Sequence, residues 1–362
     1  MNLNLFYQGL IELGLSLLTG FFVYFVSFKV FIILTKDIDE LEELKRDNIA
    51  VAVLISSFIF GIMIILKAVI SPAMDTLGFT INAGGANKAI VIYAVIRIVL
   101  FYLIAGFFSF VLLWMSIKLF MTLTTQIDEM KEIKANNAAI SLILASLIIS
   151  LSIILLNPFK VLLDGLVAPP VIIEGVKEPL INFRIFIQGL IELTLSIIAS
   201  ILLFFYCFKV INLLIKKFNE IEELKKNNLA VGILVAAFIF AMMMLIKASL
   251  IPAYNSLGYA FSDQIILKDI FFSIFQIVIF FVISAVFSFL LLWLAMKAFM
   301  IFTTTIDEMN EIKNKNTAIA LVVAVLIISA SLIVEHGLST MLSGFIKTPE
   351  LGKGLLDIST FK

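Results

Sequence analysis

The sequence predicts an all-α integral membrane protein, a bundle of eight transmembrane helices built from four parallel two-helix repeats. Three observations predict this fold class: the composition, the length of the apolar segments and an internal repeat. Of the 362 residues, 62% are hydrophobic and only 14% are charged, which is more apolar surface than a water-soluble domain can bury. Apolar runs of about 18 residues or more are typical of transmembrane helices.

The repeat is an acidic-basic segment that ends in Asn and is followed at once by an apolar run. Its four copies are residues 38–50, 127–139, 218–230 and 306–318. The segment Gln8–Leu13 also recurs, as Gln188–Leu193, so a half made of two units is duplicated. We therefore predict two halves, residues 1–170 and 171–362, separated by a proline-containing segment.

Each unit contains two apolar segments, and we predict a transmembrane helix from each. The first helices are residues 5–34, 89–122, 186–214 and 270–301, and the second helices are residues 48–70, 137–156, 228–251 and 316–334. About 20 residues at a rise of about 1.5 Å each cross the hydrocarbon, so every segment is long enough, and no proline interrupts one. Two spans return the chain to its starting side, so all four units have the same orientation.

The sides of the membrane follow from the basic residues. More than half of them lie in or just before the connectors between the first and second helices. The positive-inside rule then places the connectors in the cytoplasm and both termini outside. On the opposite side, residues 71–88, 157–183 and 252–269 contain Pro, Gly and Asn and are predicted loops.

Each connector carries apolar residues at every third position, as at Ile38, Leu41 and Leu44, which favours a helix. Either the first helix continues past the membrane, or a short amphipathic helix lies at the interface. The Asn that ends each connector suits an N-cap, because its side-chain oxygen can accept a hydrogen bond from a free backbone N–H of the second helix.

Small residues follow each of these Asn residues at intervals of four. The motif comprises Asn48, Ala52 and Ser56; Asn137, Ser141 and Ala145; Asn228, Gly232 and Ala236; and Asn316, Ala320 and Ala324. Small residues at such spacing let helix backbones approach closely in lipid. Because the first helices are rich in Phe and Trp, we expect them to face lipid and the second helices to pack inside. The alternative is a chance occurrence of Ala and Ser in apolar helices.

Charged residues inside the spans form two predicted ion pairs, Glu12 with Lys67 and Glu192 with Lys247. An unpaired charge in hydrocarbon costs several kcal/mol, and pairing offsets part of that cost. The pairs either pin helices together or handle ions or protons.

One lysine stands near the end of each first helix, at Lys29, Lys118, Lys209 and Lys297. These side chains either extend to the cytoplasmic interface or form a ring that binds anionic lipid headgroups or acids of a partner.

Catalytic and cofactor signatures are not found. His336 is the only histidine and Cys207 the only cysteine, and Gly84-Gly85 is a turn that no phosphate-loop Lys follows. A net charge of zero does not favour nucleic acid as a partner. We expect no enzyme activity, no metal and no cofactor.

The Asn-Ala step resembles that of the YjfL-like family of uncharacterised bacterial multi-pass inner-membrane proteins, domains of unknown function built from paired two-helix units. The step reads Asn48-Ile49-Ala50-Val51-Ala52 in the first unit and recurs at Asn137, Asn228 and Asn316. The resemblance covers nearly the whole chain as two fused family-sized halves, and it implies fold and location but no activity. It also implies Gly before each Asn, where this chain has Asp47, Asn136, Asn227 and Lys315.

Two function classes remain. The charges cluster toward the two faces of the membrane and few polar groups lie at mid-depth, which favours a membrane scaffold or interaction platform. The charged connectors would be its docking face for a cytoplasmic protein, and the chain could form oligomers. The alternative is an ion channel or transporter formed between repeats or subunits.

Overall fold

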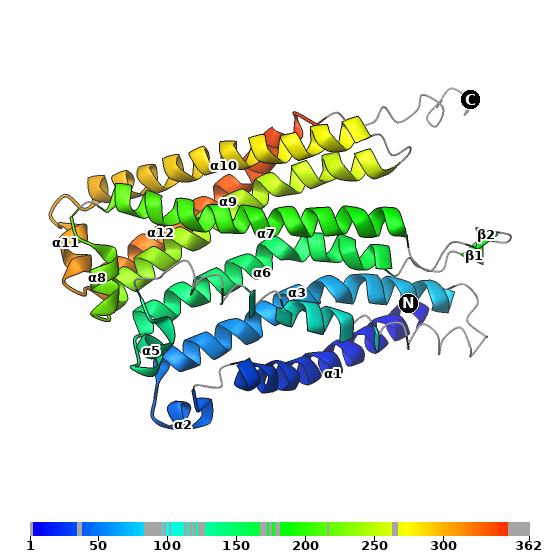
Figure 1. Ribbon diagram of the computed structural model, residues 1–362, viewed down its shortest axis with the longest axis horizontal. Coiled ribbons are helices and arrows are strands. Elements are labelled where there is room, and N and C mark those ends of the chain that lie inside the picture. Colours follow the sequence, from blue (N-terminus) through cyan, green and yellow to red (C-terminus); the bar gives the residue numbers. More distant parts are fainter. Residues whose placement is uncertain are drawn as a thin grey trace.

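The computed structural model describes residues 3–34, 38–82, 103–111, 127–166, 172–173, 176–177, 182–215, 217–262 and 267–346, and within 96–121 also residues 96, 99–100, 114–115, 118 and 121. This part of the chain is almost entirely helical (Figure 1). Two strands of two residues, β1 (Ile172–Ile173) and β2 (Val176–Lys177), pair antiparallel near the predicted boundary between the halves.

Six helices of the described chain are long and apolar enough to cross a membrane. They lie in α3 (Ile49–Asn82), α6 (Ala138–Leu166), α7 (Phe183–Leu214), α9 (Leu229–Ser262), α10 (Leu267–Phe302) and α12 (Thr317–Ser343). Helix α1 (Leu3–Leu34) precedes them. Most of the predicted span 89–122 lies outside the described residues, so a total of eight spans stays a prediction.

Helices α3, α6, α9 and α12 form a row in which each packs on the next. All four begin at the same end of the bundle, and the other long helices lie against the row (Figure 1). The membrane-length window is 83% buried in α9 and 72% buried in α6, compared with 39% in α7 and 28% in α10. These second helices are therefore inside, as expected. Helix α12 is the exception at 28%, because it ends the row.

All four second helices are longer than the sequence predicts, and α12 ends at Ser343 instead of residue 334. Helices α3, α6 and α9 continue to Asn82, Leu166 and Ser262, through the first part of each predicted loop. Pro158 and Pro252 consequently lie inside helices, and the expectation that no proline interrupts a span was wrong. Both prolines are buried, and packing by neighbouring helices makes a missing backbone hydrogen bond tolerable in a transmembrane helix.

Each connector contains a separate helix of six residues: α2 (Glu40–Lys45), α5 (Glu129–Lys134), α8 (Glu220–Lys225) and α11 (Glu308–Lys313). Their N-cap residues are Asp39, Asp128, Asn219 and Asp307, whose side chains accept hydrogen bonds from the first turn. The connector is thus a short helix with its own start, which excludes an uninterrupted continuation of the first helix.

The connector helices end in a left-handed residue directly before each Asn. Asp47, Asn136, Asn227 and Lys315 have φ of 60°, 60°, 52° and 69°. The N–H of the following Asn then donates to the carbonyl five residues back, for example Asn48 to Glu43 at 3.0 Å. This is the Schellman C-cap, in which Gly is usual and Asn occurs. The turn that the family resemblance implies is therefore formed without glycine, at a steric cost that is lower for Asn and Asp than for Lys315.

Candidate functional site

The four Asn residues stand at the N-caps of the second helices. Asn48 Oδ1 accepts from the backbone N–H of Val51 at 3.0 Å, and Asn137, Asn228 and Asn316 make the corresponding bond at 3.2, 3.3 and 3.3 Å. Each amide also donates to the Glu carboxylate five residues earlier, at 2.7 to 3.1 Å. A carboxylate therefore orients each amide.

The same amides join consecutive units. Asn48 donates to the carbonyls of Ile133 and Lys134 at 3.2 Å, and Asn137 donates to that of Leu224 at 2.8 Å. Asn228 donates to the carbonyls of Ile312 and Lys313, at 3.2 and 2.8 Å. In each case the acceptors lie at the end of the connector helix of the next unit. Three Asn side chains thus hold four units in register.

Small residues about one turn after each Asn allow the second helices to pack closely against each other. A Cβ built on Gly232 of α9 lies only 2.7 Å from Ala139 Cα of α6. Ser141 Oγ donates to the carbonyl of Ala50 at 2.5 Å, so α6 approaches α3 in the same way. Ala145, Ala236, Ala320 and Ala324 are also buried, whereas Ala52 is half-buried and Ser56 is exposed. The predicted packing role of Ser56 is therefore not seen among the described residues, because α3 is the first helix of the row that they form.

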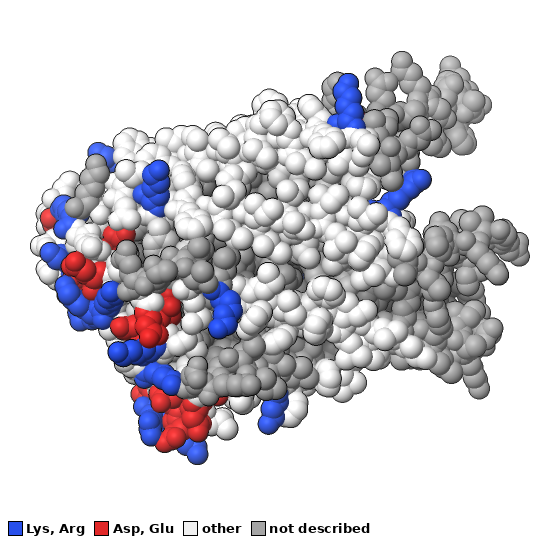
Figure 2. Space-filling view, viewed as in Figure 1, with Lys and Arg blue, Asp and Glu red and all other residues white. Residues whose placement is uncertain are grey.

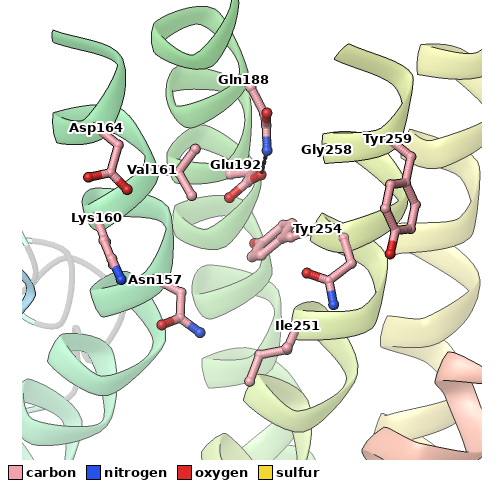
Figure 3. A pocket seen from close by; sticks show the side chains of 11 residues that line it. Asn157, Lys160, Val161, Asp164, Gln188, Glu192, Ile251, Tyr254, Gly258 and Tyr259 are labelled. Atoms are coloured by element: carbon pink, nitrogen blue, oxygen red, sulfur yellow. Dashed lines mark hydrogen bonds between the residues drawn. The ribbon is translucent and has the colours of Figure 1, made fainter. Parts of the chain in front are cut away.

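A second candidate site lies toward the opposite end, between α6, α7 and α9 (Figure 3). It is a cavity of about 520 Å³. Its polar lining residues are Asn157, Lys160, Asp164, Gln188, Glu192, Tyr254, Asn255 and Tyr259. Glu192 is 1% exposed and accepts a hydrogen bond from Gln188 Nε2 at 2.7 Å, and Tyr254 hydrogen-bonds Ser196.

Close helix contacts fix the geometry of this cavity. A Cβ on Gly189 of α7 would lie 2.4 Å from Leu162 Cα, and one on Gly165 of α6 would lie 2.2 Å from the Phe186 backbone nitrogen. Only residues without a side chain allow α6 and α7 to approach this closely. The cavity offers an ammonium group, two carboxylates, amides and phenols, a set that can bind a small polar or charged solute.

The predicted pair between Glu192 and Lys247 is not formed. Lys247 Nζ instead pairs with Glu335 Oε1 of α12 at 2.9 Å. The physical reason is the row of second helices, which places α12 directly against α9. Lys67 is exposed, and the Glu12 side chain of the other predicted pair lies outside the described residues.

The predicted lysine set is exposed throughout, at Lys29, Lys118, Lys209 and Lys297. Lys29 Nζ lies 5.9 Å from the Phe25 ring centroid and Lys297 Nζ 5.8 Å from that of Trp293. Each of these two side chains therefore covers an aromatic ring of its own helix, which suits an interface between lipid and water.

Sequence reasoning missed four buried carboxyl groups in the connector helices. Glu40, Glu129 and Glu220 are each 2% exposed and Glu308 is 5% exposed. They occupy the first position of the four connector helices, and Thr303 donates a hydrogen bond to Glu308. The one signal in the sequence is that a Glu recurs at this position in all four copies.

Burial raises the pKa of Glu129 from 4.5 to about 7, and burial also raises the pKa of Glu220. By contrast, the hydrogen bond from Lys226 lowers the pKa of Glu223. Since the folded pKa of Glu129 lies above its ordinary value, the folded chain keeps a proton that the unfolded chain releases between pH 4.5 and about 7. The contribution of Glu129 to stability therefore falls as the pH rises through this window.

We expect Glu129→Gln to remove this pH dependence. The Gln side chain stays neutral, so the variant should unfold at a higher temperature than the wild type at pH 8, with little difference at pH 4. Thermal unfolding in lipid nanodiscs at both pH values measures this. The matched control is Glu222→Gln, which changes an exposed side chain of α8. Equal gains at both pH values, or none at pH 8, would contradict the expectation.

Comparison with known families supports the repeat. A family model described as Domain of Unknown Function (DUF350) matches the chain four times, at residues 4–107, 98–167, 185–289 and 273–359. No curated protein and no solved structure matches the chain. The four matches follow the four units, so the internal repeat is confirmed.

Proposed function

The chain belongs to the DUF350 family, and we propose that it is a multi-pass membrane scaffold whose connector helices form a docking face for a cytoplasmic protein. The observation that supports this best is the separation of charge from apolar surface. In Figure 2 the acidic side chains and most of the basic ones gather at the end that carries α2, α5, α8 and α11. The long helices between the two ends are almost uncharged in this view.

The proposal includes the membrane arrangement. The chain crosses a plasma (inner) membrane eight times as four parallel units, with the connectors in the cytoplasm. The common starting end of α3, α6, α9 and α12 supports parallel units (Figure 1). The lysines of the connectors support the cytoplasmic assignment, because short basic loops are retained on that side.

The exposed charges of the connectors define the docking face. Glu43 and Glu223 are engaged with Asn48 and Asn228, so they serve the junctions between units. The exposed charged positions on the connector helices are Glu42, Lys45, Lys131, Lys134, Glu222, Lys225 and Lys313. Helices α2 and α8 present exposed charges of both signs, whereas α5 and α11 present only Lys, and this mixed pattern favours a partner with a complementary arrangement over a uniformly charged one.

The test is co-purification from membranes solubilised in mild detergent. We expect a cytoplasmic protein to be retained by the wild type and to be reduced about tenfold, which corresponds to roughly 1.4 kcal/mol, by combining Glu42→Lys with Glu222→Lys. These changes leave the Asn junctions intact. The control is Asp269→Lys, a single charge reversal on an exposed residue at the start of α10, at the other end of the bundle. Equal retention in all three proteins would contradict the proposal.

A channel or transporter is the second candidate, and the polar cavity between α6, α7 and α9 supports it. The buried Glu192 lies there without the lysine that the sequence predicts as its partner. Buried acids inside membrane helices commonly mark ion or proton pathways. Ion flux through the reconstituted chain that is lost in Glu192→Gln would overturn the scaffold proposal.

A further inference from the structure

The three junctions inside the chain repeat one set of contacts. In every junction the earlier unit supplies the Asn amide and the next unit supplies the connector carbonyls. In the first two junctions the Ala two residues after the Asn also contacts the small residue four after the next Asn, and in the third the corresponding Ala230 and Ala320 are both buried. The Ala residues that take part are Ala50, Ala139 and Ala230, each 0% exposed. Every junction therefore joins two different surfaces, and a row of units must leave one of each kind at its ends.

The free surface of the last unit lies on α12. Ala318 corresponds to the three buried Ala residues but is exposed. Val322 is 55% exposed, whereas its counterparts Leu54, Ile143 and Leu234 are at most 2% exposed. Among the described residues, the Asn316 amide donates only to Glu311. The last unit thus presents the same surface that the first three units bury.

The free surface of the first unit lies on α2 and α3. Leu44 is 38% exposed, whereas its counterparts Ile133, Leu224 and Ile312 are at most 1% exposed. Ala52 is half-buried and Ser56 exposed, although the corresponding residues of the other units are all buried. The first unit thus presents the complementary surface.

We propose that these two surfaces bind each other between copies, so that α12 of one copy packs on α2 and α3 of the next. The occupant is a second copy of this chain, because the contact would continue an interface that the chain itself forms three times. Asn316 would donate to the carbonyls of Leu44 and Lys45 of the next copy, and Ala318 would meet its Ala52. The row of second helices then passes from one molecule to the next.

The residues at the turn before the Asn fit this contact. Asn136 and Asn227 accept hydrogen bonds from the backbone N–H groups of Ala50 and Ala139, at 3.2 and 3.3 Å. Asp47 holds the same position in the first unit and has a carboxylate that accepts as well. In the proposed contact it accepts from the N–H of Ala318.

The contact joins different surfaces of identical molecules, so its repetition gives a closed ring or an open filament, in which equal faces never meet. A single chain cannot close on itself, because α6 and α9 lie between α3 and α12 in the row. Cross-linking therefore distinguishes a contact between the two different faces of neighbouring copies from a contact between two equal faces.

The test uses cysteine pairs in a Cys207→Ser background, with two differently tagged copies produced together in the same membrane. One copy carries Ala52→Cys and the other Ala318→Cys. We expect a disulfide that joins the two differently tagged copies, at a yield within about twofold of the intrachain control. That control is Ala230→Cys with Ala320→Cys in one chain, the corresponding positions of the inner junction. Ala52→Cys with Met300→Cys, on the exposed face of α10 near the connectors, measures random collision.

Three results would overturn the proposal. The first is no mixed-tag product above the Met300→Cys level while the intrachain control forms. The second is a disulfide between two copies that both carry Ala52→Cys, or both Ala318→Cys, since this requires equal faces to meet. The third is a purely intrachain disulfide in the variant that carries both Ala52→Cys and Ala318→Cys. For this variant we expect a series of disulfide-linked multimers.

Discussion

Replacing Asn228 with alanine is expected to lower the free energy of unfolding by about 3 kcal/mol or more. The side chain is 0% exposed and bonds the carbonyls of Ile312 and Lys313, the Glu223 carboxylate and the N–H of Val231. Loss of an N-cap costs about 1 kcal/mol, and each buried group left without a partner costs roughly 1 to 3 kcal/mol. The change therefore removes a helix cap and opens the junction between the third and fourth units.

The last unit offers a matched control at Asn316. Asn316 caps α12 and bonds Glu311, but among the described residues its amide bonds no carbonyl of another unit. Asn316→Ala should therefore cost only about 1 kcal/mol, the value of the cap. Thermal unfolding of the detergent-solubilised single chain measures both variants. Equal losses in the two variants would show that the bonds between units contribute nothing to stability.

The repeat and the caps could be predicted from the sequence because their causes are local. The periodic apolar runs require membrane-length helices, and an Asn at the start of such a run can serve only a few backbone N–H groups. Bonds from the same amide to a unit more than 80 residues later depend on which helices become neighbours. Nothing near Asn48 in the sequence points to Ile133, and only the repeated spacing shows that every unit carries the same side chain.

The ion pairs show where local reasoning fails. Glu192 and Glu335 both lie at a depth from which an acid could reach Lys247, and the sequence pattern favoured the one in the same unit. The structure selects Glu335, since α12 packs on α9. When two acids lie at a similar depth, the one that pairs with the lysine is the one on the helix packed against it. Membrane depth and sequence spacing do not show which helices become neighbours.

The polar cavity was missed because part of its lining lies in segments that carry turn-forming residues. Lys160, Asp164 and Tyr254 follow a proline closely, and proline usually marks the end of a helix. Packing in the bundle keeps these segments helical, and their polar side chains line the cavity (Figure 3). The buried Glu residues of the connectors were missed for a related reason: charge predicts exposure unless tertiary contacts cover it.

The Gly232→Ala substitution is expected to destabilise the chain, although it improves the helix propensity of α9. A Cβ at this position would lie 2.7 Å from Ala139 Cα and 2.9 Å from Ala139 Cβ, so the backbones of α6 and α9 must separate. Overpacking of this kind costs about 1 to 3 kcal/mol, and larger side chains cost more. Separation would also lengthen the bond from Ser146 Oγ to the carbonyl of Ala236, one turn further along the same contact.

Gly337→Ala in α12 separates this packing effect from helix propensity. Nothing lies within 4 Å of a Cβ built on Gly337, and the residue is exposed. There the added methyl group only restricts the unfolded chain, so the variant should gain up to about 1 kcal/mol. The two changes are chemically identical and should move the unfolding temperature in opposite directions. If Gly232→Ala also raised the unfolding temperature, α6 and α9 would not be in close backbone contact at this position. Such contact could then not be what holds the units together.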